Sequence, residues 1–143
     1  QVETREMRKM EFHRGRLIDH VHLRVSDLEK SRAFYRAVLV AIGRELTHET
    51  DTFFVSDELF VDQADTYVSR VHIAFQATGP DMVKRFHEAG IANGGADNGA
   101  PGERSYHPGY YGAYILDPDG NNIEAVWHGP ARRSAESVTI TAS

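Results

Sequence analysis

The chain has 143 residues and a mass of 16.0 kDa, which suits one domain rather than two. Its 16 basic and 21 acidic residues give a formal net charge of −5, so we expect no basic surface for nucleic acid or for an anionic membrane. The absence of cysteine excludes disulfides, thiolate metal sites and a cysteine nucleophile, whereas eight histidines point to metal or proton chemistry.

Both ends of the chain are expected to lie outside the folded domain. Residues 1–16 are crowded with charged side chains and do not begin with Met, which indicates a processed or artificial extension rather than a secretory signal. Residues 131–143 form a tail, in which residues 137–141 have the strand propensity needed to pair with a sheet edge. The longest apolar run, residues 37–42, is far shorter than the ~20 residues of a membrane-spanning helix. We expect a cytoplasmic protein.

The first half of the chain predicts a strand, a helix and two short strands. Polar and apolar residues alternate from His20 to Val25, which is the period of a strand with one covered face. The capping box Ser26-x-x-Glu29 begins a helix that runs toward Gly43. Short strands are predicted around residues 52–55 and 59–63.

The second half repeats this order. Residues 71–76 alternate in the same way, and a helix begins at Pro80 and stops near Gly90. Strands are predicted at residues 111–116 and 122–127. The tight turn Asp117-Pro-Asp-Gly120 joins them, so Asp117 and Asp119 are interpreted as turn residues rather than catalytic ones.

The two halves are internal repeats. An offset of 52 residues places His20 over His72, Phe34 over Phe86 and Gly43 over Gly95. We therefore predict an α+β domain over residues 17–130, made of two βαβββ modules at about 17–66 and 67–130. With helices on the apolar faces, the strands would form an open curved mixed sheet whose polar faces line a cup.

The polar faces of these strands carry side chains that suit a metal. The residues expected in the cup are His20, His22, Arg24, Asp62, His72, Gln76, Asn122 and Glu124. Imidazoles and carboxylates that converge on one pocket are the donor set of a divalent transition metal. Such a metal activates a bound water or polarises a substrate oxygen.

Three segments resemble the vicinal oxygen chelate superfamily, which includes glyoxalase I, bleomycin-binding proteins, fosfomycin-resistance thiol transferases and extradiol dioxygenases. The segments are residues 20–29 with Phe34-Tyr35, residues 71–75, and residues 114–124, and the resemblance extends over 17–128. It implies the two-module fold described above. Because modules of this superfamily commonly pair across two chains, it also implies a homodimer.

The resemblance implies a divalent metal (Fe, Mn, Ni or Zn) with ligands His20, His72 and Glu124, the last also catalytic. The fourth ligand position, which glyoxalase I fills with Glu, falls near Asp62. Asp is one methylene shorter, so three alternatives stay open for Asp62: it is a direct ligand, it reaches the metal only through water, or it does not reach the metal at all.

The long connection over residues 99–112 is predicted to be a substrate wall. Arg104 would hold an anionic group, and Tyr106, Tyr110 or Tyr111 would donate a hydrogen bond to a substrate oxygen. His107 would move a proton, and Tyr111 is the tyrosine assigned to catalysis. His22, beside the cup, is assigned to substrate contact. The remaining histidines are expected at the surface: His13, His48, His87 and His128.

Two classes of function follow. The first is a metal-dependent enzyme acting on a small oxygen-chelating substrate, with a glyoxalase-like lyase or isomerase preferred over a small extradiol-type dioxygenase or a thiol transferase. The second is a non-catalytic ligand-binding protein similar to the bleomycin resistance proteins. The two classes are separated by whether a divalent metal ion is bound and required.

Overall fold

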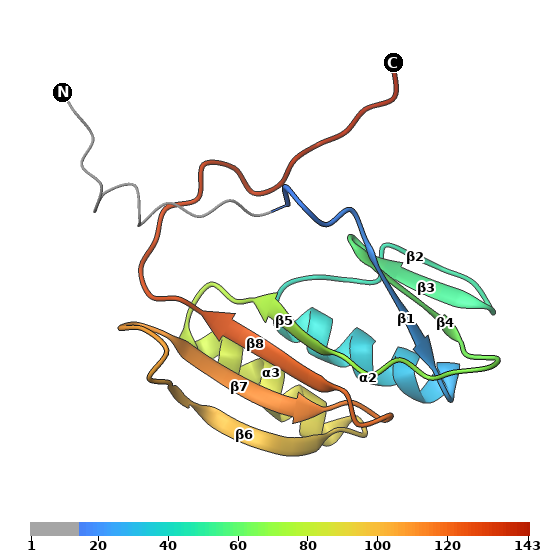
Figure 1. The fold of residues 1–143 in the computed structure, drawn as a ribbon. Coiled ribbons are helices and arrows are strands. Elements are labelled where there is room, and N and C mark those ends of the chain that lie inside the picture. Colours follow the sequence, from blue (N-terminus) through green and yellow to red (C-terminus); the bar gives the residue numbers. More distant parts are fainter. Residues whose placement is uncertain (1–14) are drawn as a thin grey trace.

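The computed structural model describes residues 15–143, so most of the predicted N-terminal extension and His13 lie outside the described residues. Figure 1 shows two modules of the same order. The first module contains β1 (Val21–Val25), α2 (Leu28–Ala41), β2 (His48–Glu49), β3 (Phe53–Ser56) and β4 (Leu59–Gln63). The second contains β5 (His72–Gln76), α3 (Pro80–Ala92), β6 (Ala96–Glu103), β7 (Tyr111–Leu116) and β8 (Asn122–Trp127).

Each module forms its own four-stranded mixed sheet. The strand orders are β1-β4-β3-β2 and β5-β8-β7-β6. In both sheets the first strand of the module pairs in parallel with its last strand, and the other pairings are antiparallel. The predicted α+β fold of two βαβββ modules is therefore confirmed.

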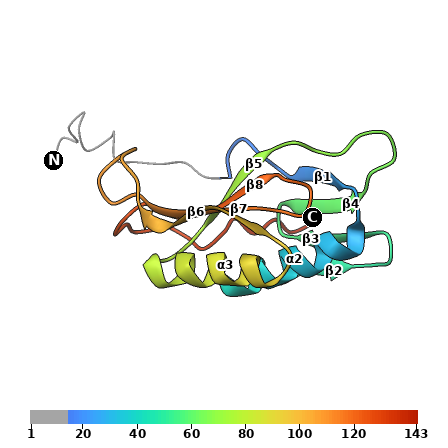
Figure 2. The ribbon, with the colours of Figure 1, turned by 90° about the horizontal axis from the view of Figure 1, so that it is seen from below.

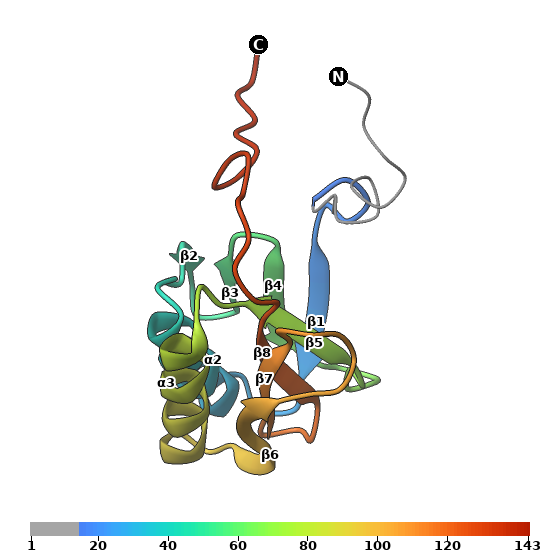
Figure 3. The ribbon, with the colours of Figure 1, turned by 90° about the vertical axis from the view of Figure 1, so that its left-hand side faces the viewer.

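The helices cover one face of the strands and leave the other face open (Figures 2 and 3). The predicted alternation places Leu23 and Val25 of β1, and Ile123 and Ala125 of β8, in the core. These residues belong to one hydrophobic cluster that extends through both modules. The polar residues at alternate positions consequently lie on the open face.

The prediction for residues 99–112 is wrong in part, because residues 99–103 belong to strand β6. The segment Ala96–Glu103 contains two glycines and a proline, a composition that indicates a loop. The strand forms nevertheless, with irregular pairing to β7 between Asp97 and Gly99 and again between Gly99 and Gly102. These irregularities are where the turn-forming residues are accommodated.

The C-terminal tail carries no helix or strand. The strand-forming segment at residues 137–141 is exposed and pairs with no sheet edge in the described chain. Arg133 makes the contact of the tail with the second sheet, where its Nη1 donates to Gln76 Oε1 at 2.5 Å. No helix among residues 15–143 has the length and apolar character needed to cross a membrane.

A buried hydrogen bond joins the two modules. The Tyr35 hydroxyl on α2 donates to Asp117 Oδ2, 2.5 Å away in the turn before β8. Asp117 Oδ1 accepts from the backbone N–H groups of Asp119 and Asn121, which confirms its interpretation as a turn residue. Burial, followed by the negative charge of Asp117, raises the pKa of Tyr35 well above its ordinary value.

We expect Tyr35→Phe to lower the free energy of unfolding by about 1–3 kcal/mol, because the buried, charged oxygen Asp117 Oδ2 loses one of its two donors and keeps only Asn121 Nδ2. The ordinary pKa of Tyr is about 10, and the folded protein holds the pKa of Tyr35 above it, so this contribution is complete below pH ~10 and falls as the pH rises further. Urea denaturation at pH 7 and pH 10.5 tests both points (the second value is about half a unit above that ordinary pKa). Exposed Tyr67→Phe is the control; equal stability of Tyr35→Phe and the wild type at neutral pH would contradict the expectation.

Candidate metal and substrate site

The centre of the candidate site is a contact between His72 and Glu124 on the open face of the second sheet. Strands β5 and β8 are parallel neighbours, with Ala74 opposite Glu124 in the register. His72 Nε2 lies 2.8 Å from Glu124 Oε1. The Glu124 side chain is only 2% exposed, whereas that of His72 is 53% exposed. Glu124 is thus a buried carboxylate with an imidazole between it and solvent.

Two tyrosines close the other side of Glu124. Tyr110 donates its hydroxyl to Glu124 Oε2. Tyr114 stands opposite Glu124 in the β7–β8 register, with its ring centre 6.0 Å from that of His72. Burial and the hydrogen bond to Glu124 raise the pKa of Tyr110 well above its ordinary value. Burial, with a hydrogen bond to Tyr106, raises the pKa of Tyr114 to about 12, so both phenols remain neutral donors near pH 7.

The predicted loop residues lie around these tyrosines. Tyr106 is exposed and packs edge-on against Tyr110 at 4.9 Å between ring centres. The Arg104 guanidinium lies over the ring of Tyr114 at 5.3 Å and donates to Ala100 O at 2.7 Å. Arg104 therefore supports the loop and the ring beside the site.

His107 is fully engaged within the loop. Its Nδ1 donates to Pro108 O at 2.9 Å, which leaves Nε2 to accept from His128 Nδ1 at 2.8 Å. Both ring nitrogens are thus occupied, a position that does not suit the predicted role of His107 as a proton carrier. His128 is exposed, as expected, and stacks on His107.

Tyr111 lies on the wrong face for the catalytic role predicted for it. It is half-buried and packs against the hydrophobic core, whereas Glu124 and its neighbours lie on the open side of the sheet. Since residues 110 and 111 are adjacent on the way into β7, only one of them can face Glu124. The structure places Tyr110 there.

The first module holds its own polar cluster, built around Asp62. His22 Nε2 lies 2.8 Å from Asp62 Oδ1, and Arg24 Nε lies 3.4 Å from the same oxygen. His20 is separate from this cluster: its side chain is 64% exposed, with Nδ1 2.6 Å from Asp19 Oδ1. His22 in β1 and His20 just before β1 therefore have different carboxylate partners.

The strand registers show which residue in the first module corresponds to Glu124. In the second sheet Glu124 lies two residues beyond Asn122, the partner of His72. The first sheet has the same parallel pairing, in which His22 is opposite Phe60 and Arg24 is opposite Asp62. The equivalent of Glu124 is therefore Phe60. Asp62 lies two residues beyond Phe60 in β4, so it does not occupy the position equivalent to Glu124, where the fourth ligand was expected.

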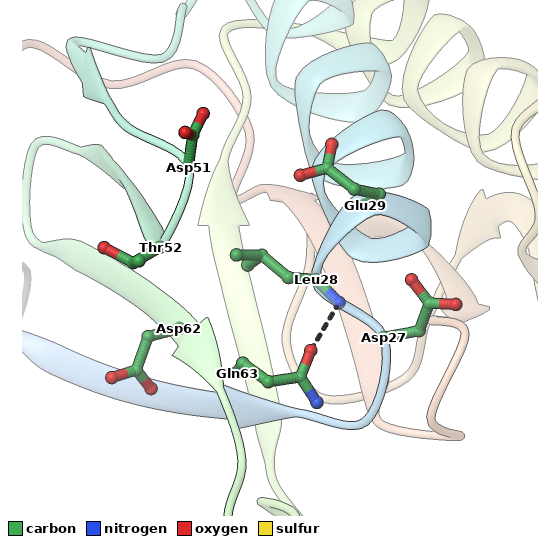
Figure 4. Close-up of a pocket in the computed structure, with 7 residues that line it drawn as sticks. All are labelled: Asp27, Leu28, Glu29, Asp51, Thr52, Asp62 and Gln63. Atoms are coloured by element: carbon green, nitrogen blue, oxygen red, sulfur yellow. Dashed lines mark hydrogen bonds between the residues drawn. The ribbon is translucent and has the colours of Figure 1, made fainter.

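Two hollows lie in the first module. One, of about 450 Å³, lies at the start of α2 and is shown in Figure 4. There Gln63 points toward the helix, where the Leu28 N–H donates to its Oε1 at 3.0 Å, while Asp62 points away. The second hollow, of about 360 Å³, is lined by His20, His22, Val55, Asp57 and Phe60. Neither includes His72 or Glu124.

Of the predicted ligands, the structure brings together His72 and Glu124. Within residues 15–143, no three His, Asp or Glu side chains lie close enough to hold one metal ion. Sequence reasoning missed Tyr114, which lies opposite Glu124 in the second sheet, and Phe60, which lies opposite His22 in the first sheet. Tyr114, within β7, follows Tyr110 at even spacing, which is a detectable signal, whereas the position of Phe60 depends on the strand register.

The paired βαβββ modules, with a histidine–glutamate pair on the open face of the second sheet, define a glyoxalase-like protein. The chain belongs to the Glyoxalase/Bleomycin resistance protein/Dioxygenase superfamily, whose family description matches residues 17–125.

Solved structures share this fold. The chain is 33% identical to a glyoxalase/bleomycin resistance protein from Albidiferax ferrireducens, with a TM-score of 0.67 over 77% of this chain and 98% of that one. A glyoxalase-related enzyme from Fulvimarina pelagi is 20% identical, with a TM-score of 0.63 over 89% and 99% of the two chains. A lactoylglutathione lyase from Agrobacterium tumefaciens is 22% identical, with a TM-score of 0.57 over 78% and 92%. The last two show likeness of fold alone. No match was found among curated proteins.

Proposed function

We propose that this chain is a divalent-metal-dependent enzyme, a glyoxalase-like lyase or isomerase for a small substrate that chelates through two oxygens. The observation that carries the proposal is the 2.8 Å contact between His72 Nε2 and Glu124 Oε1. Two ligands about 2.1 Å from one ion, at a right angle, would lie about 3 Å apart. The pair therefore has the chemistry and spacing of two adjacent ligands.

The burial of Glu124 supports the same role. A carboxylate that is 2% exposed costs free energy unless it is paired, hydrogen-bonded or coordinated. His72 provides a partner on one oxygen and Tyr110 a donor on the other. A cation beside Oε1 would compensate the charge further.

His20 of a second copy is the proposed third ligand, because catalytic metal sites usually have three protein ligands. By the repeat, His20 corresponds to His72, and its exposed side chain precedes the edge strand β1. A symmetric homodimer in which the first module of one copy faces the second module of the other would contain two identical sites. Asp62 is left out of the ligand set, because the strand register makes Phe60, two residues before it, the equivalent of Glu124.

When bound, the metal would polarise the chelating substrate oxygens and stabilise the charge that develops on them. Glu124, held at Oε2 by the Tyr110 hydroxyl, would take the substrate proton and return it. The neutral phenol of Tyr114 and the adjacent Arg104 would form the substrate wall on the β6–β7 side. Arg104 there would favour an anionic substrate group.

Metal uptake tests the proposal. Protein purified without chelator and then offered Fe²⁺, Mn²⁺, Ni²⁺ or Zn²⁺ is expected to retain metal stoichiometrically, and His72→Ala is expected to lose it. His87→Ala is the matched control, because His87 Nε2 makes the same 2.8 Å contact with a carboxylate, Asp97, away from the site. Full occupancy in His72→Ala would remove this residue from the site. Failure of the wild type to take up any of these metals would favour the ligand-binding class.

A mixing experiment tests the second copy. His20→Ala and His72→Ala are each expected to lose metal as separate proteins. After denaturation and refolding together, a mixed dimer would combine an intact first module of one copy with an intact second module of the other, and about a quarter of the sites would return. No recovery in mixed dimers would show that His20 and His72 do not share a site across copies.

A further inference from the structure

Resting on the metal site proposed above, we infer that Tyr110 positions Glu124 as a metal ligand: its hydroxyl holds Oε2, so that Oε1 alone is offered on the His72 side. Sequence reasoning assigns Tyr110 to substrate contact. Its hydroxyl is instead committed to Glu124.

The two oxygens of Glu124 have different partners. Oε1 lies 2.8 Å from His72 Nε2, whereas Oε2 accepts from the Tyr110 hydroxyl. Because the side chain is 2% exposed, water has little access to replace a lost donor. The orientation of the carboxylate therefore depends on these two contacts.

Gly112 provides the space for this contact. A Cβ at this position would lie 3.3 Å from Glu124 Oε2 and 3.3 Å from Tyr110 Cε1. It would also lie 3.3 Å from the backbone oxygen of Ala125, which has little freedom to move away. The absence of a side chain at Gly112 thus allows the Tyr110 phenol to reach the Glu124 carboxylate across β7.

Aromatic rings hold the Tyr110 ring in place. Tyr106, His107 and His128 meet it edge-on, with ring centres 4.9, 5.4 and 5.1 Å away. The Tyr110 N–H donates to His107 O at 3.2 Å, and its carbonyl accepts from the Arg104 N–H at 3.0 Å. With ring and backbone both fixed, the hydroxyl is preorganised rather than recruited when a metal binds.

A carboxylate held by one oxygen can ligate through the other alone. Loss of the Tyr110 donor would free Oε2, so that Glu124 could rotate away from the ion or bind it through both oxygens. Hydrogen-bond partners of metal ligands typically contribute 10- to 100-fold to metal affinity. The role of Tyr110 is therefore that of a positioning residue.

Isothermal titration of Zn²⁺ into the 143-residue chain tests this role. For Tyr110→Phe we expect the Kd to rise by about 10- to 100-fold. Tyr106→Phe is the control, because this exposed tyrosine contacts the Tyr110 ring but donates no hydrogen bond to Glu124. Its Kd is expected to stay close to that of the wild type, and both variants should keep the wild-type circular dichroism. The melting temperature is expected to fall in Tyr110→Phe alone, because the buried Glu124 carboxylate loses a donor. An equal loss in both variants, or none in Tyr110→Phe, overturns the inference.

The visible spectrum of the Co²⁺-loaded protein provides a second readout that altered packing alone would not change. A carboxylate that binds through both oxygens raises the coordination number, so the Co²⁺ bands of Tyr110→Phe should weaken and shift, while those of Tyr106→Phe should not. An unchanged Co²⁺ spectrum with unchanged affinity rejects the role of Tyr110 and leaves the metal site standing. A wild type that binds neither ion rejects the metal site and this role with it.

Discussion

Glu124→Gln is expected to weaken metal binding by more than about 100-fold, beyond the usual cost of removing an outer partner of a ligand. The substitution keeps the shape of the side chain and the acceptor for Tyr110, but it removes the negative charge beside His72 Nε2. A neutral amide is a much weaker ligand for a divalent transition metal than a carboxylate. Turnover should vanish with the metal, since the same residue is the proposed proton carrier.

Asp62→Asn is the matched control for this variant. Asp62 makes a 2.8 Å contact with His22 that resembles the contact of Glu124 with His72. It lies in the first module, however, two residues beyond Phe60, which is the position equivalent to Glu124. Zn²⁺ titration of both variants should give a large loss for Glu124→Gln and little change for Asp62→Asn. A loss of similar size in Asp62→Asn would restore Asp62 as a ligand, and wild-type affinity in Glu124→Gln would contradict the proposed site.

Phe34→Ala is expected to lower the free energy of unfolding by about 3–5 kcal/mol. Phe34 on α2 is fully buried and meets Tyr35 edge-on at 4.9 Å between ring centres. It also reaches the second module, because a Cβ placed on Gly95, after α3, would lie 2.7 Å from Phe34 Cε1. A cavity at this position would therefore remove contacts that join the two modules.

Urea denaturation followed by far-UV circular dichroism and Trp127 fluorescence measures this effect. Val40→Ala, on the exposed side of the same helix, is expected to change stability by less than ~1 kcal/mol. Since Trp127 lies in the second module, a shift in its fluorescence transition after a change in α2 would report the coupling directly. A loss below that of Val40→Ala would show that the ring is not part of a shared core.

The fold was largely predictable because its strongest signals are local. Alternation defines β1, β4 and β8, and the turn at Asp117 separates β7 from β8 with the correct bounds. Strand β6 was not predictable, because its glycines and proline resemble a loop and its pairing is decided by the neighbouring β7. Tertiary context there overrides local propensity.

The candidate site was predictable only within each strand. Side-chain parity places His72 and Glu124 on the same open face, and the structure brings them into contact. The order of residues across strands depends on register, which sequence does not state, so Asp62 was expected at the position that Phe60 occupies. Where the loop enters β7, the sequence also did not show which of two adjacent tyrosines points to the open face. Tyr110, not Tyr111, faces Glu124.

Phe60 in the first sheet and Glu124 in the second occupy equivalent positions of the internal repeat. The two sheets therefore have different surfaces there. Phe60 stacks on Phe53 at 5.2 Å between ring centres, so the first sheet presents aromatic rings where the second presents an ionisable pair. In the proposed dimer, each site would be lined by an apolar aromatic surface from one copy and by an ionisable surface from the other. A bound molecule with an oxygen-rich end and a hydrocarbon end would then have one preferred direction of entry. A preferred orientation of such substrates would thus arise from a single difference between two otherwise matching halves.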